Sequence, residues 1–209
     1  MRLRVPPGRA GRLWLRRRRD VLQHGLAVLD RKLRILRQER DRLALHATRT
    51  GREWEAACRT ADDWSLRAAL LGGRRAIRLA DDGRLGEVRV DWIDAMGTSY
   101  PGRAFFQAPE EPDPSTSLPL TAALVPARDA CRTALRAAVE HAAAKEAERI
   151  VSAEEEATSR RIRALRDHIL PRIEAALTEV ELSLDEMERA DGARVRRAIA
   201  SRASRPREQ

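Results

Sequence analysis

The chain has 209 residues, of which 35% are charged and only 3% are aromatic, and it carries a formal net charge of +9. This composition excludes a thick globular core and is typical of long helices that each bury one narrow stripe of side chains. The positive charge indicates an acidic partner, and nucleic acid, an anionic membrane surface and an acidic protein surface all stay open at this point.

The apolar segments of the sequence are short. None approaches the roughly 18 residues that a membrane-spanning helix needs, and no apolar run follows the arginines at the start of the chain. We therefore expect a cytoplasmic protein without direct membrane insertion. Cys58 and Cys131 fit that compartment as reduced thiols, because disulfides are rare in the cytosol.

A heptad repeat of mainly apolar residues begins at Leu15 and continues to Leu71. Seven-residue spacing over this length predicts a coiled-coil helix, and a second apolar position four residues on completes its seam. The glycine pair at 72–73 is a typical helix end, so we expect one helix over residues 10–71, after an N-terminal tail at 1–9. The expected seam residues are Leu15, Leu22, Leu29, Leu36, Leu43, Trp54 and Trp64.

A second helical stretch is predicted over residues 126–200, followed by a tail at 201–209. Its apolar residues recur at spacings of three and four, and Pro171 inside it should bend the helix locally. The expected seam residues are Ile162, Ile169, Ile173, Val180 and Met187. Two helices of similar length bury their stripes by folding back on each other, so the predicted fold is all-α dominated, a long antiparallel two-helix coiled coil.

The middle segment, residues 72–125, differs from both helices. Residues 76–79 and 85–93 flank the Asp-Asp-Gly sequence at 81–83, and Val88, Val90 and Trp92 alternate with charged residues. This pattern predicts a short β-hairpin with its turn at 81–83. The acidic, proline-rich stretch 109–119 is expected to be an exposed loop.

Catalytic patterns are missing from the sequence. It contains no glycine-rich phosphate loop, no nucleophile elbow and no histidine or cysteine pair at metal-ligand spacing. We therefore expect no catalytic residue, no cofactor and no metal ion. The acidic run 154–156 is expected only to solvate its face of the second helix.

Several stretches resemble one family, the D subunits of V/A-type rotary ATPases. The opening PPGRAGRLWL at 6–15 and AMGTSYP at 95–101 are similar to family motifs, and the clearest matches lie in the second helix: RRIRAL at 160–165, ILPRI at 169–173 and LDEMER at 184–189. Arg163, Arg166 and Ala190 depart from the residues usual in the family, which puts contacts at those positions in doubt.

This resemblance implies a non-catalytic rotor shaft that transmits torque between an ATPase hexamer and the ion-translocating ring of the membrane. The implied partners are the catalytic and regulatory subunits (A and B), the small F subunit of the stalk and the funnel-shaped subunit (C or d) that docks on the ring, all on the cytoplasmic face of the membrane. Nucleic acid is not among them. The implied hexamer contacts are Arg9, Arg12, Arg16, Arg17, Arg18, Arg189 and Arg194. Candidates for contact with the small F subunit are Val88, Val90, Trp92 and Met96, and Pro171 is the expected bend.

Without the resemblance, the residues leave two other functions open. A basic coiled coil could bind nucleic acid, in which case its affinity would fall steeply as salt rises. It could also be a scaffold that dimerises between chains.

Overall fold

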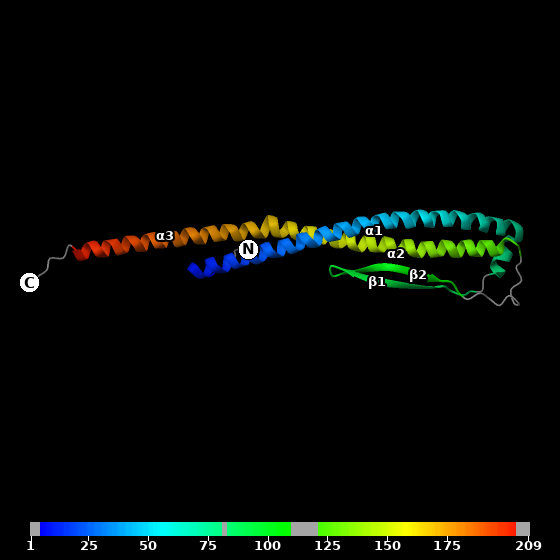
Figure 1. Cartoon of the computed structure of the whole chain (residues 1–209), viewed down its shortest axis with the longest axis horizontal. Helices are drawn as coiled ribbons and strands as arrows, with labels where there is room; N and C mark the ends of the chain where they lie inside the picture. Colours follow the sequence, from blue (N-terminus) through cyan, green and yellow to red (C-terminus); the bar gives the residue numbers. More distant parts are fainter. Residues whose placement is uncertain (1–4, 81–82, 110–120, 204–209) are drawn as a thin grey trace, which may run out of the picture. The chain divides into compact units, whose positions relative to one another are not determined.

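The computed structural model describes residues 5–80, 83–109 and 121–203. The elements follow in the order α1 (Gly8–Leu79), β1 (Glu87–Ala95), β2 (Thr98–Gln107), α2 (Leu124–Ala164), a π-helical turn η1 (Leu165–Ile169) and α3 (Leu170–Ala203), as drawn in Figure 1. They form two compact units. Unit 1 contains the described parts of residues 1–32 and 158–209, and unit 2 contains those of residues 33–157.

Within each unit the paired helices run antiparallel. In unit 1, Arg9 contacts Glu188 and Arg16 contacts Glu181, so the partner number falls as the α1 number rises. In unit 2, Thr50 contacts His141 in the same sense, and Ser65 then contacts Cys131. The predicted fold class, two long helices packed together with a short β-hairpin in the middle segment, is confirmed.

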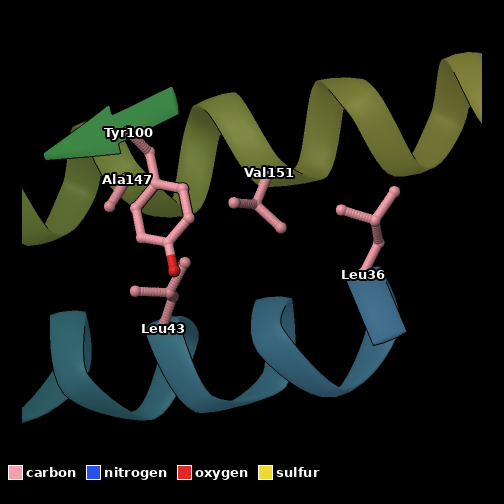
Figure 2. Packing of buried hydrophobic residues seen from close by; sticks show 5 residues of the cluster. All are labelled: Leu36, Leu43, Tyr100, Ala147 and Val151. Atoms are coloured by element: carbon pink, nitrogen blue, oxygen red, sulfur yellow. The ribbon is translucent and has the colours of Figure 1, made fainter. Parts of the chain in front are cut away.

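The two units differ in what fills the seam between their helices. In unit 1 the core is made of large side chains, Leu15, Ile173 and Leu177. In unit 2 one cluster joins Leu36 and Leu43 to Ala147, Val151 and Tyr100, as Figure 2 shows. Most other buried seam residues of unit 2 are alanines: Ala47, Ala61, Ala68, Ala76, Ala123, Ala127, Ala134 and Ala144. Their small side chains allow a close approach of the helices.

The helix α1 contains a kink where the sequence indicated a helix end. Gly73 has φ 65° and ψ 175°, values outside the helical region that glycine adopts without a steric penalty. The chain then resumes a helical turn and continues to Leu79. Residues 76–79 are therefore helical, and their expected role as a strand of the hairpin was wrong.

The hairpin lies later in the chain than the sequence pattern indicated. Strands β1 and β2 pair antiparallel, and their turn is Met96 and Gly97, both with positive φ. Two positive φ values match the turn whose twist fits a two-residue hairpin loop. The turn of the hairpin is therefore not at 81–83, of which 81 and 82 lie outside the described residues, and the loop 109–119 lies outside them as well after its first residue.

A π-helical turn interrupts the second helix directly before Pro171. The Leu170 amide donates to the carbonyl of Leu165, five residues back. Proline has no amide proton, and its ring collides with the carbonyl four residues earlier in a regular α-helix, so a wider turn accommodates it. A π-helical turn contains more residues than an α-helical turn, so the apolar face of the helix is rotated about the helix axis at this point. As a result Ile169 is 39% exposed and Ile173 is fully buried. The expected seam position of Ile169 was wrong.

The remaining expected seam residues fall into three groups. Buried in the structure are Leu15, Leu36, Leu43, Ile162 and Ile173. Half-buried are Leu22, Leu29, Trp64 and Val180. Trp54 and Met187 are exposed and were wrongly placed in the seam. The ring of Trp54 stacks on His141 beside the seam. Met187 precedes Glu188, which pairs with Arg9 in the first turn of α1, so it lies where the helix pair ends.

Candidate functional site

The candidate functional features of this chain are surfaces. Among residues 5–80, 83–109 and 121–203, no three histidine, cysteine or acidic side chains gather closely enough to hold a metal ion. Over the same residues, no helix has an apolar stretch sufficient to cross a bilayer.

Arginines from both ends of the described chain meet in unit 1. Arg9 donates to Glu188 at 3.1 Å and Arg16 donates to Glu181 at 2.6 Å, so the first turns of α1 lie beside residues 181–188 of α3. This arrangement places Arg9 beside the turn of α3 that carries Arg189. We call this set the terminal arginine surface: Arg9, Arg12, Arg16, Arg17, Arg18, Arg189 and Arg194.

The charges of this surface are held weakly. The side chains of Arg9 and Glu188 keep 78% and 61% of their exposure, and an ion pair in that setting contributes about 0–1 kcal/mol. Arg194 binds Asp191 on its own helix, and the guanidinium of Arg18 lies 5.1 Å from the ring centroid of Trp14. These partners are local or solvated, so the guanidinium groups can exchange them for others at low cost.

Helix α3 continues beyond its partner in unit 1. The segment 5–8, where α1 begins, lines a groove on α3 that ends at Met187, and Figure 1 shows α3 running on past it. On this extension Val195 is 58% and Ile199 63% exposed, among arginines. A helix with an exposed apolar stripe typically packs on another surface.

Tyr100 fastens the hairpin to the helix pair of unit 2. Its ring is buried between α1 and α2, with Leu43 and Ala147 on either side (Figure 2), and its hydroxyl donates to Oε1 of Glu39 at 2.7 Å. Arg42 also binds Glu39. The Arg42 hydrogen bond lowers the pKa of Glu39, while burial, aided by the Glu39 hydrogen bond, raises the pKa of Tyr100.

The outer part of the hairpin exposes apolar side chains. Val88 is 54%, Val90 37%, Trp92 60% and Met96 43% exposed. The sequence pattern put Val88, Val90 and Trp92 on one face, and the register agrees, because the extra residue of the β-bulge is Gly102 on β2 and β1 keeps its alternation. Tyr100 pairs with Ile93, which lies on the other face of β1. The face of β1 that carries Val88, Val90 and Trp92 therefore offers apolar contacts.

The kinked end of α1 carries exposed leucines that sequence reasoning did not identify as a surface. Leu66, Leu70, Leu71 and Leu79 are each more than 60% exposed, and we call them the apolar end surface. Arginines at positions 67, 74, 75 and 78 border it. The signal in the sequence was the spacing of Leu66 and Leu70, four residues apart and outside the heptad.

Polar groups join α1 to α2 inside unit 2. Glu155 accepts from Arg37 at 3.1 Å and from Arg40 at 2.5 Å, and only 11% of its side chain is exposed. The expectation that the acidic run 154–156 is wholly solvated was therefore wrong for Glu155. Fourteen residues earlier, His141 is hydrogen-bonded to buried Thr50 at 3.2 Å and stacks on Trp54.

Comparison with known proteins identifies one family. A family model that describes the D subunit of ATP synthase matches residues 13–200, which is nearly the whole chain. No individual curated protein matches the sequence.

Proposed function

Because this chain belongs to the family of ATP synthase D subunits and is thereby a non-catalytic stalk component of a rotary ATPase, we propose that it is the rotor shaft that transmits torque. In this role it connects the hexamer of catalytic and regulatory subunits to the ion-translocating ring. The complex would lie on the cytoplasmic face of the membrane, with this chain peripheral to the bilayer.

The observation that carries the proposal is the extension of α3 beyond α1 in unit 1. A single helix with exposed Val195 and Ile199 and flanking arginines can enter a narrow pore that a helix pair cannot. The terminal arginine surface then meets carboxylates and carbonyl groups of the pore wall. Exposed arginines with weak partners can exchange contacts as the shaft turns, whereas a buried salt bridge would hold one angle.

The antiparallel pairing supports transmission of force along the chain. A lone helix in water is only marginally stable, whereas a pair that buries a continuous seam resists bending and unwinding. In unit 1 the seam is built from Leu15, Ile173 and Leu177. Unit 1, which we place next to the hexamer, therefore has larger side chains in its core than the alanine-rich seam of unit 2.

The other two surfaces fit the remaining partners. We assign the exposed apolar residues of the hairpin, Val88, Val90, Trp92 and Met96, to contact with the small F subunit of the stalk. We assign the apolar end surface to the funnel-shaped partner that docks on the ring. Leucines bordered by arginines fit a socket that is apolar at its centre and acidic at its rim.

The test is co-purification from cells that also express the A, B and F subunits of the same complex. Truncation after Gly192 removes the exposed part of α3 and is expected to reduce recovery of the hexamer while leaving the F subunit bound. The matched variant Trp92→Ala/Val88→Ser is expected to reduce recovery of the F subunit and leave the hexamer bound. Failure of the full chain to bind either the hexamer or the F subunit would refute the rotor assignment.

A further inference from the structure

The carboxylate of Glu155 lies in the seam of unit 2, where a coiled coil normally has an apolar side chain. Its side chain is 11% exposed and each of its oxygens accepts from a different arginine of α1. Seven residues later, the equivalent position of the second helix is occupied by buried Ile162. A charge so placed has to be matched by the opposite helix, because an unpaired buried carboxylate is strongly unfavourable.

Beyond the cluster of Leu36, Leu43, Ala147, Val151 and Tyr100, the seam of unit 2 gives little other information about register. Alanines dominate this remaining part on both helices, including Ala47, Ala61 and Ala68 of α1 and Ala127, Ala134 and Ala144 of α2. Alanine side chains present nearly the same small surface at every heptad. Ala61 and Ala68 are one heptad apart, as are Ala127 and Ala134, so a shift of α2 by seven residues, roughly 10 Å, would place alanine on alanine again in that part of the seam.

From this placement we infer that Glu155, held between Arg37 and Arg40, fixes the register of α1 against α2. The residues seven positions earlier in α1 are Asp30 and Leu33, and those seven positions later are Ala44 and Ala47. Either shift takes Glu155 away from both arginines. The first sets it against a second carboxylate and a leucine, and the second sets it against two alanines, so both shifted registers are penalised.

A disulfide between the two native cysteines, Cys58 and Cys131, would detect one of these shifted registers. In the structure Cys131 lies against Ser65, with Sγ 3.8 Å from Oγ, and both cysteines are free. Cys58 is one heptad before Ser65, so a seven-residue shift would bring it opposite Cys131. The unmodified chain thus forms a Cys58–Cys131 disulfide only from the shifted register. The variant Cys58→Ser/Ser65→Cys forms one with Cys131 from the native register.

The experiment measures the initial rate of each intramolecular disulfide in the purified full chain under mild oxidation. The two test variants are Glu155→Gln, which keeps the size of the side chain, and Arg40→Leu/Glu155→Leu, which replaces the ion pair with apolar groups and so keeps the seam filled. The control is Glu148→Gln, one heptad earlier, because Glu148 pairs with Lys145 on its own helix and not across the seam. Circular dichroism checks that each variant is helical.

We expect the Cys58–Cys131 disulfide to form several-fold faster in both test variants than in the control, and the native-register disulfide to form more slowly. Unchanged rates of both disulfides in the helical double variant would overturn the inference. This measurement needs no partner protein, so its result is independent of whether the chain serves as a rotor shaft.

Discussion

The hydroxyl of Tyr100, on β2, donates a 2.7 Å hydrogen bond to Oε1 of Glu39, on α1. The two residues are 61 positions apart in the chain, and their contact fixes where the hairpin lies on the helices of unit 2. Arg42 holds the same carboxylate from one turn further along α1. The hairpin is therefore anchored by a buried ring and by a charge network of the helix that it covers.

Tyr100→Phe should lower the free energy of unfolding by about 1 kcal/mol, because the ring stays buried and only the hydrogen bond is lost. Tyr100→Ala, which also empties the space between Leu43 and Ala147, should lower it by roughly 3–5 kcal/mol. Urea unfolding followed by circular dichroism measures both changes. Equal stability of the phenylalanine variant and the parent would show that the hydrogen bond does not stabilise the fold.

The same network predicts a dependence of stability on acid. The hydrogen bond from Arg42 lowers the pKa of Glu39 below its ordinary value of 4.5 in the folded chain. A lowered folded-state pKa means that the contribution is complete above the unfolded value and is lost as the pH falls through the folded value. The stability difference between the parent and Glu39→Gln should therefore shrink below about pH 4.5. Urea titrations at a series of pH values measure it, and a constant difference would contradict the prediction.

Two isoleucines of the second helical stretch allow a matched test of the π-helical turn. Ile173→Ala should lower stability by roughly 2–5 kcal/mol, because Ile173 is fully buried against Leu15. Ile169→Ala should lower it by less than about 1 kcal/mol, since Ile169 is 39% exposed. Thermal unfolding distinguishes the two. Similar losses at both positions would indicate a regular α-helix through Pro171.

Two glycines of α1 give a second matched pair. A methyl group on Gly25 would meet nothing within 4 Å, so Gly25→Ala should raise stability by about 0.5–1 kcal/mol through helix propensity. On Gly51 it would lie 3.1 Å from the ring of His141, which Thr50 and Trp54 hold in place. Gly51→Ala should gain none of this stability, because the ring has to move. An equal gain at both positions, measured by urea unfolding, would contradict this view of the seam.

The sequence alone predicted the helices of this protein well because their signals are local and repeated. The heptad that begins at Leu15 places an apolar side chain at the same angle on each pair of turns, and no distant residue is needed to see it. The glycine pair at 72–73 was recognised as a break for the same reason. The hairpin was placed too early, because the Asp-Asp-Gly sequence is a stronger turn signal than Met96–Gly97 when each is considered by itself.

The sequence by itself determined the two-helix fold class and, through motifs along most of the chain, the family. The tertiary structure decided which of two similar residues is buried in the seam, Ile173 and not Ile169. It also placed the carboxylate of Glu155 at a seam position where the repeat predicts an apolar side chain. These choices depend on the groups opposite, the wide turn that admits Pro171 and the two arginines that neutralise Glu155. A periodic pattern specifies which face of a helix is buried, but only the partner helix specifies what that face has to match.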